Sequence, residues 1–279
     1  MKLLVTGISG LLGKQVRHLL TFLPQITSTF VVRHHPVADN ELYWDFQKPL
    51  PEGLKFDALL HMASVIDYTP QSSVLHKNTL PAISLLDAVK RNDSNVYFTS
   101  TASIHGQHFP WAIDSPVEPA DDYAFSKLVC ERIFQALPER VCIFRLNGIY
   151  GFQNSSHLGI NRAIYQALVS KKKPELFGEG AQLRNYISDI SAAQWILHEV
   201  LQKERKSKIV YMAGSETLSI KSWLKTIAEI LLEDDTIDIY PGRDNLDVLV
   251  HASHSPVQMP SFSDYLKKLR KQYENMLLF

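Results

Sequence analysis

A tyrosine and a lysine four residues apart form the pair in this sequence that is best suited to acid–base chemistry. Tyr123 and Lys127 lie in the run DYAFSKLVCERIFQAL, whose pattern predicts a helix over 122–137, so both side chains leave the same helix face. A tyrosine at its ordinary pKa of about 10 is a poor base at neutral pH, but a nearby ammonium stabilises the phenolate and lowers that pKa. Tyr123 is therefore expected to exchange a proton with a substrate hydroxyl or carbonyl.

Two hydroxyl groups precede this helix at the end of a predicted strand. The run NVYFTST (95–101) ends in Ser100 and Thr101, at the carboxyl edge of the sheet to which that strand would belong. One of the two hydroxyls is expected to hold the substrate oxygen that Tyr123 protonates.

Three glycines spaced three apart follow the first apolar run of the chain. The sequence MKLLVTGISGLLG places Gly7, Gly10 and Gly13 between a predicted strand (3–7) and a predicted helix (10–23). Glycine permits positive φ and lets a pyrophosphate approach the backbone, while the helix N-terminus supplies N–H donors and a favourable dipole. This context predicts a dinucleotide-binding turn.

The end of the second predicted strand bears on which dinucleotide binds. An acidic residue at that point would accept hydrogen bonds from the ribose 2′-hydroxyl, whereas a basic one would pair with a 2′-phosphate. The sequence FVVRHHP has Arg33 there and no carboxylate before Asp39, which favours NADP(H) over NAD(H). The alternative is that Arg33 stacks on the adenine or lies in solvent.

The elements that must position these residues alternate between strand and helix. Apolar, near-continuous strands of this kind predict a doubly wound α/β fold (Rossmann), in which helices cover both faces of a parallel sheet. We expect residues 1–150, with returning segments near 186–215, to form the NAD(P)-binding domain, and 151–185 with 216–279 to form a smaller C-terminal substrate-binding region. The strands are predicted at 3–7, 28–33, 56–63, 95–101 and 141–146, and the helices at 10–23, 74–92, 122–137 and 186–202.

Composition excludes several classes of function. The 29 basic and 29 acidic residues balance, so no surplus charge points to nucleic acid or to an anionic membrane. Two cysteines, Cys130 and Cys142, are too few for a disulfide framework and fit no metal motif, so we expect buried thiols, no metal and a cytoplasmic protein. No apolar run has the length of a signal peptide core or a membrane span.

Several motifs in order resemble those of the extended short-chain dehydrogenase/reductases, in the NAD-dependent epimerase/dehydratase family that includes UDP-galactose 4-epimerase. TGISGLLG, with Ser9, resembles the nucleotide fingerprint, LLHMAS (59–64) the H-x-A-[AS] strand, and KNTLPAISLLDAVK the Asn-bearing helix. STASIHG resembles S-[ST]-x-x-V-Y-G, YAFSK resembles Y-x-x-x-K, FRLNGIYG resembles R-x-x-x-[VI]-Y-G, and GEGAQLRNY resembles the arginine segment G-x-G-x-x-x-R-[DN]-[YF].

The resemblance implies roles for the matching residues. Thr101, Tyr123 and Lys127 would form the catalytic triad, and Arg184 would grip the diphosphate of a nucleotide sugar, unless it only forms a surface salt bridge. Residues on the cofactor side would bind the dinucleotide: Gly7, Ser9, Gly10, Leu11, Leu12 and Gly13 around the pyrophosphate, Asp45 and Phe46 beside the adenine, and Met62 and Ala63 along the cofactor. Asn78, Ser100, Tyr123 and Lys127 would also bind it, with Lys127 bonding the nicotinamide ribose.

The chain departs from the family pattern at three positions. Arg33 replaces the acidic residue of NAD-preferring members. Asn147 stands one place before the usual Asn position, which is Gly148 here, so its contact with substrate is an open expectation. His105 replaces the Tyr of V-Y-G, and its imidazole would either donate a hydrogen bond to substrate or simply pack.

The resemblance implies hydride transfer at a sugar carbon of a nucleotide-linked sugar, expected at C4. Ala102 and Ser103 follow Thr101, where 4,6-dehydratases carry an Asp-Glu pair, so dehydration is not expected. A 4-ketoreductase and an epimerase remain, and Arg33 favours the former. The alternatives are a non-catalytic NAD(P)(H)-binding sensor or scaffold, and a reductase of a small non-nucleotide carbonyl. The family also suggests a homodimer.

Overall fold

A seven-stranded parallel sheet forms the centre of the molecule in the computed structural model, which describes residues 1–46, 48–67, 73–137, 139–154, 159–203, 205–243 and 245–276. The strands lie in the order β11-β6-β5-β4-β1-β2-β3, and every neighbouring pair is parallel. Their bounds are β1 (Lys2–Thr6), β2 (Thr27–Val32), β3 (Glu41–Tyr43), β4 (Ala58–His61), β5 (Asn95–Thr101), β6 (Val141–Leu146) and β11 (Lys208–Met212).

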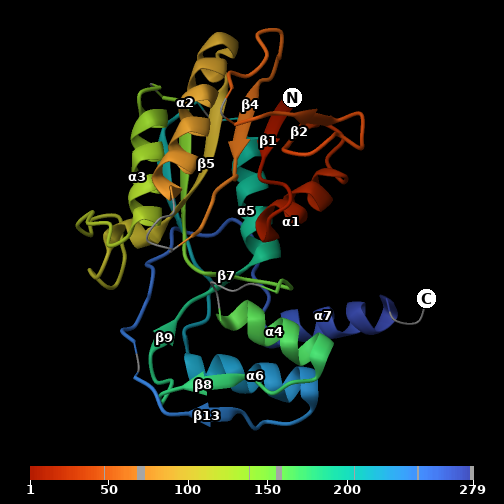
Figure 1. The fold of residues 1–279 in the computed structure, drawn as a ribbon, viewed down its shortest axis with the longest axis vertical. Helices are drawn as coiled ribbons and strands as arrows, with labels where there is room; N and C mark the ends of the chain where they lie inside the picture. Colours follow the sequence, from red (N-terminus) through yellow and green to blue (C-terminus); the bar gives the residue numbers. More distant parts are fainter. Residues whose placement is uncertain are drawn as a thin grey trace.

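Helices cover both faces of this sheet, so the predicted doubly wound α/β architecture is confirmed (Figure 1). Helices α1 (Leu11–Leu20) and α5 (Asp189–Gln202) pack on one face, and α2 (Val74–Asn92) and α3 (Asp122–Gln135) on the other. Because both faces are covered, strands β4 and β6 are buried along their whole length. The strand order reverses between β1 and β4, which is where folds of this type bind ligands.

Two strands of the sheet were not predicted from the sequence. Strand β3 has only three residues and pairs with Phe30–Val32 of β2, while β11 extends the sheet on the far side of β6. The predicted helix over 186–202 begins only at Asp189, because Ile187 and Ser188 form the short strand β10 and Ser188 then caps α5.

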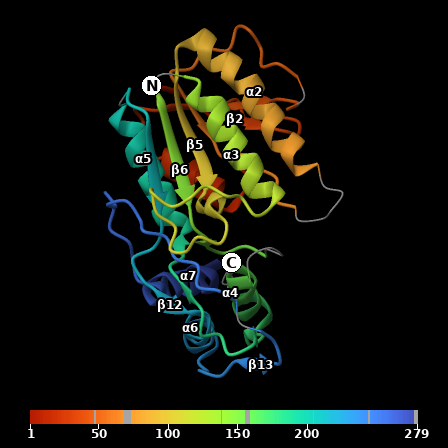
Figure 2. The same ribbon diagram turned by 90° about the vertical axis from the view of Figure 1, so that its left-hand side faces the viewer.

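A smaller group of elements packs below the sheet around its own apolar cluster. Tyr150, Trp223 and Phe262 are among its buried members, and their rings contact one another. The elements concerned are α4 (Gly159–Ser170), α6 (Ile220–Leu232), α7 (Phe262–Met276), β8 (Glu175–Phe177), β9 (Leu183–Arg184), β12 (Leu218–Ser219) and β13 (Asp238–Tyr240). Strands β5 and β6 point their carboxyl ends toward this group (Figure 2).

Two short elements connect the sheet to the smaller group. Strand β7 (Ile149–Tyr150) follows β6 and pairs in parallel with β10 (Ile187–Ser188). The 3-10 helix η1 (Ala102–His105) follows β5 directly and packs against α3. Among the described residues, no helix combines the length and the hydropathy that crossing a membrane would require.

Candidate functional site

The three glycines of the turn after β1 differ in what surrounds them. Gly7 has φ +84°, and a Cβ there would lie 2.5 Å from the backbone N of Ala63. A Cβ on Gly13 would lie 2.1 Å from the carbonyl oxygen of Gly7, so this glycine lets α1 approach the end of β1. Gly10 is different, because the nearest atom to its Cβ position is 3.5 Å away. A Cβ on Gly10 would therefore meet the described protein atoms without a clash.

The first turn of α1 has backbone N–H groups that no side chain caps. Gly10 is the N-cap, and Leu11 and Leu12 open the helix with Ser9 exposed beside them. An N-cap glycine has no side chain with which to cap the free N–H groups, so they remain suited to an anion.

A buried threonine and histidine hold the segment after β4 against this turn. The Ala63 N–H donates to Thr6 Oγ1 over 3.2 Å, and Thr6 Oγ1 lies 2.7 Å from His61 Nδ1. Burial, with the charge of Lys127 acting in the same direction, lowers the pKa of His61 to about 3. A neutral His61 thus fixes Met62 and Ala63, which were expected to line the cofactor, at the edge of the turn.

The residues expected near the adenine lie at the ends of β2 and β3. Arg33 follows β2 and is exposed, with its guanidinium carbon 5.9 Å from the centre of the Phe46 ring. Asp45 and Phe46 follow β3 and are partly buried, and Asp45 lies 3.8 Å from the Lys48 ammonium. Arg33 is therefore beside Phe46, and residues 33–38, which follow β2, include no Asp or Glu.

Helix α3 carries Tyr123 in its first turn and Lys127 one turn further on. The Asp121 carboxylate caps the helix by accepting the Ala124 N–H over 2.7 Å. Lys127 is only 3% exposed, and its Nζ lies 4.5 Å from the centre of the Phe98 ring. Burial lowers the pKa of Lys127 to about 8, while Cys130 and Glu131 act in the opposite direction. Lys127 is thus a buried cation on the helix face that also carries Tyr123.

Asn78 connects the segment after β4 to α3 through hydrogen bonds. Its Oδ1 accepts the Val65 N–H over 2.8 Å, and its Nδ2 donates to the Val65 carbonyl and to Ser126 Oγ. Ser126 in turn donates to the Tyr123 carbonyl over 2.7 Å. The side chain of Asn78 therefore bonds protein atoms and aligns the segment after Met62 and Ala63 with the Tyr123 turn.

Strand β5 delivers its hydroxyls to the same region. Ser100 follows Phe98 by two residues and so faces α3, and its Oγ is buried with no partner among the described residues. Thr101 ends β5 and is the N-cap of η1, and its Oγ1 accepts the Ser103 N–H over 3.1 Å and lies 2.8 Å from Ser103 Oγ. Two hydroxyl groups therefore lie together at the end of β5, and a third, buried one has no bond to the described protein atoms.

Asn147 and Arg184, which were expected to bind substrate, lie on two segments that Asn185 connects. Asn147 follows β6, and its Nδ2 donates to Asn185 Oδ1 over 2.7 Å. Arg184 is the preceding residue, partly buried in β9, and its guanidinium donates to the carbonyls of Leu183 and Leu246 over 2.7 and 2.8 Å. Asn147 therefore bonds the segment that carries Arg184.

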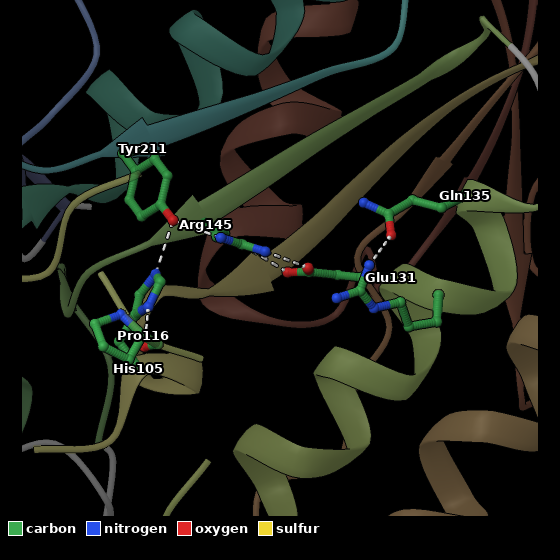
Figure 3. Close-up of polar contacts among 7 residues, drawn as sticks. His105, Pro116, Glu131, Gln135, Arg145 and Tyr211 are labelled. Atoms are coloured by element: carbon green, nitrogen blue, oxygen red, sulfur yellow. Dashed lines mark hydrogen bonds and ion pairs between the residues drawn. The ribbon is translucent and has the colours of Figure 1, made fainter. Parts of the chain in front are cut away.

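His105 lies inside the protein. It is fully buried, and its two ring nitrogens lie 2.8 Å from the Pro116 carbonyl and 2.7 Å from the Tyr211 hydroxyl (Figure 3). Both nitrogens thus have protein partners, which corresponds to the packed alternative considered for this residue.

Sequence reasoning missed the residues that support the expected ones. Ser103 contacts Thr101 two residues along the chain, and Ser126 contacts Tyr123 three residues along, so local spacing held a signal for both. Tyr211 contacts His105 from 106 residues away, and no local pattern relates the two.

The chain was compared with known proteins. The family model described as "NAD dependent epimerase/dehydratase family" matches residues 3–214. UDP-glucose 4-epimerase of Azospirillum brasilense is 24% identical over 269 residues, covering 82% of this chain and 77% of the relative. A dTDP-glucose 4,6-dehydratase of Mycolicibacterium smegmatis is 23% identical over 230 residues, covering 70% of this chain and 68% of the relative.

A solved structure shares the whole fold. UDP-glucuronic acid 4-epimerase from Bacillus cereus, crystallised in complex with NAD, superposes with a TM-score of 0.82 at 19% identity, covering 99% of this chain and 97% of the other. The likeness extends over the sheet, its helices and the smaller C-terminal group.

Proposed function

Because the chain belongs to the NAD-dependent epimerase/dehydratase family, we propose that it catalyses hydride transfer at a carbon of a nucleotide-linked sugar, as a 4-ketoreductase or an epimerase. One observation carries the proposal: Lys127 is buried one helical turn after Tyr123, on the face of α3 that meets β5. Burying an ammonium costs free energy, and buried charges of this kind gather at functional sites. Here the ammonium would stabilise a tyrosine oxyanion.

The residues after β1 and β5 fit a nicotinamide dinucleotide. The first turn of α1 has backbone N–H groups that no side chain caps, and Ser100 Oγ has no bond to the described protein atoms, so both provide groups that such a cofactor would bond. Bound there, the nicotinamide would supply or accept the hydride. Gly7 and Gly13 shape the pyrophosphate turn, and Met62 and Ala63 line the cofactor.

Acid–base work falls to residues of α3 and β5. Tyr123 exchanges the proton with the sugar oxygen, and Lys127 offsets the negative charge that develops on the phenolate. Thr101, supported by Ser103, holds the same oxygen. Neither Ala102 nor Ser103 offers a side chain suited to protonating a departing hydroxyl, so we propose no dehydration step.

Substrate recognition is assigned to the smaller C-terminal region, residues 151–185 and 216–279. Arg184 would bond the diphosphate with the part of its guanidinium not directed at the Leu183 and Leu246 carbonyls. Asn147 is proposed to hold the Arg184 segment in place through Asn185 rather than to contact the sugar.

We also propose that NADP(H) binds more tightly than NAD(H). Arg33 is exposed at the end of β2, where it would pair with a 2′-phosphate, and the Phe46 ring beside it limits the directions it can take. In Arg33→Asp the ratio of the two dissociation constants should move toward NAD(H) by at least tenfold. An unchanged ratio would show that Arg33 does not determine which of the two cofactors binds more tightly.

The reaction itself is tested by incubating the protein with a panel of nucleotide sugars and 4-keto nucleotide sugars. Absorbance at the NAD(P)H band and product analysis are followed together. Cofactor consumption identifies a ketoreductase, and isomer formation without net oxidation identifies an epimerase. Turnover of only small, non-nucleotide carbonyls, or of none of these compounds despite cofactor binding, would contradict the proposal.

A further inference from the structure

A chain of buried polar side chains runs through the protein beside the candidate site (Figure 3). The Glu131 carboxylate accepts two hydrogen bonds from Arg145, over 3.1 and 2.7 Å. Arg145 also donates to the Tyr211 hydroxyl, which lies 2.7 Å from His105 Nε2, and His105 Nδ1 lies 2.8 Å from the Pro116 carbonyl. Glu131, Arg145, Tyr211 and His105 are each at most 5% exposed.

Only one arrangement of hydrogens satisfies this chain. The Pro116 carbonyl can only accept, so His105 Nδ1 must carry the proton. The Arg145 guanidinium can only donate, so the Tyr211 oxygen accepts from it and the Tyr211 O–H donates to the unprotonated Nε2 of His105. Burial also lowers the pKa of His105, which keeps the ring neutral. The chain therefore fixes one tautomer and one orientation of the ring.

The two ends of the chain belong to the elements that carry the catalytic groups. Glu131 lies on α3, one turn beyond Lys127 and two turns beyond Tyr123. His105 is the last residue of η1, the short helix that Thr101 caps. Arg145 lies on β6 beside β5, so the chain crosses from α3 to η1 through the interior and not through the site.

Tyr211 is held rigidly where the chain turns. Its N–H donates to Ser253 Oγ, its carbonyl accepts the Ser253 N–H, and its ring packs in a buried cluster with Ala102, Trp111 and Val250. Because the backbone and the ring of Tyr211 are both held, its hydroxyl keeps a fixed position and orients the His105 ring that it bonds.

We propose that Tyr211 and His105 are positioning residues, which set Thr101 at the end of β5 against Tyr123 and Lys127 on α3 through the Tyr211–Arg145–Glu131 chain. The inference rests on the proposed function for its kinetic consequence. Its structural part, that Tyr211 and His105 hold η1 in place, depends only on the hydrogen bonds described above.

The test compares Tyr211→Phe, His105→Leu and His105→Gln with the wild type. Tyr97→Phe is the matched control, because it removes another buried tyrosine hydroxyl from the same sheet, one that interacts with the Val200 carbonyl at 3.5 Å and with Asn95 and not with the chain of Glu131, Arg145, Tyr211 and His105. Turnover of the sugar identified by the panel, the dissociation constant of NADPH, the melting temperature and amide hydrogen exchange of residues 101–106 are measured for each variant.

Tyr211→Phe and His105→Leu should lower kcat at least tenfold, with the NADPH dissociation constant within twofold of the wild type and faster exchange at 101–106. His105→Gln should recover most of the turnover lost in His105→Leu, because one amide can donate to Pro116 and accept from Tyr211. The control should keep both kcat and the exchange rates.

Two results would overturn the inference. In one, Tyr211→Phe keeps kcat within twofold or leaves exchange at 101–106 unchanged. In the other, kcat falls only in step with cofactor affinity and melting temperature, as a general loss of structure would produce. If the wild type turns over no sugar in the panel, the proposed function fails by itself, and the exchange data alone then decide whether the pair holds η1.

Discussion

At the residue scale, the proposed chemistry depends most on Lys127, a buried lysine. Its ammonium lies against the Phe98 ring with almost no exposure, and burial lowers its pKa to about 8. The residue therefore carries its charge at neutral pH and loses it in mildly alkaline solution.

Turnover should follow that charge. The ammonium is present below about pH 8 and lost above it, so kcat should fall as the pH rises through this region. In Lys127→Arg the cation persists to high pH, so any remaining activity should show no alkaline decline there. Measured pH profiles of kcat for the two proteins test this, and an identical decline in both would exclude Lys127 as its origin.

Two glycines of the same turn should respond differently to one added methyl group. Gly7→Ala places a Cβ at positive φ and against Ala63, so the free energy of unfolding should fall by about 2 kcal/mol. Gly10→Ala meets no atom closer than 3.5 Å, so its free energy of unfolding should fall by less than about 1 kcal/mol, the effect of a poorer N-cap, yet it should bind NADPH at least tenfold more weakly. Urea unfolding and cofactor titration of both variants check the contrast. Equal cofactor loss with equal destabilisation would contradict it.

At the element scale, α3 is the helix on which the site depends, and Asp121 caps it. Asp121→Ala should lower the free energy of unfolding by about 1 kcal/mol, because it leaves the Ala124 N–H without its partner. Asp122→Ala is the control, since Asp122 is exposed and interacts with the helix mainly through the macrodipole, and it should cost about 0.3 kcal/mol. Denaturant unfolding of both variants decides, and equal losses would show that the cap contributes little.

Elements with a strong local pattern could be predicted, and those defined by pairing could not. The glycine turn with α1, and Tyr123 with Lys127 on α3, depend on spacings of three and four residues that are visible in the sequence. Strand β3 exists because Glu41–Tyr43 pairs with the end of β2, and three residues carry no recognisable period. The environment of His105 depends on Tyr211 and Arg145, which belong to strands β11 and β6, so only the fold reveals it.

At the scale of the whole molecule, burial of neutral His61 should make stability depend on pH. The folded pKa of about 3 is below the ordinary value of 6.5, so in this range only the unfolded chain takes up the proton. The contribution of neutral His61 to the free energy of unfolding is then fully present above about pH 6.5, and it falls as the pH decreases toward 3. Between pH 7.5 and 5 His61 should account for about 2 kcal/mol.

Replacing the histidine isolates its share of this loss. His61→Asn should have a free energy of unfolding that declines by about 2 kcal/mol less between pH 7.5 and 5 than that of the wild type. Urea unfolding at the two pH values measures the difference. Parallel declines in the two proteins would show that other groups cause the acid sensitivity.

The outer face of α2 and α3 is where we propose that two copies of the chain associate. Ile83 and Leu75 of α2 and Phe125 of α3 are 48%, 39% and 46% exposed. Ile83→Lys should convert a dimer into a monomer, whereas Ile239→Lys, at an exposed residue of β13, should leave it intact. Light scattering coupled to size exclusion gives the masses. A wild-type protein that is already monomeric would contradict the proposal.

The most direct test of the account is the Tyr123→Phe variant, examined for cofactor binding and turnover in the same preparation. The change removes one oxygen and leaves α3, its Asp121 cap and buried Lys127 in place. We expect the dissociation constant of NADPH to stay within about threefold of the wild type, and kcat on the nucleotide sugar to fall by at least about a hundredfold. Turnover close to that of the wild type would contradict the assignment of Tyr123 as the group that exchanges the proton.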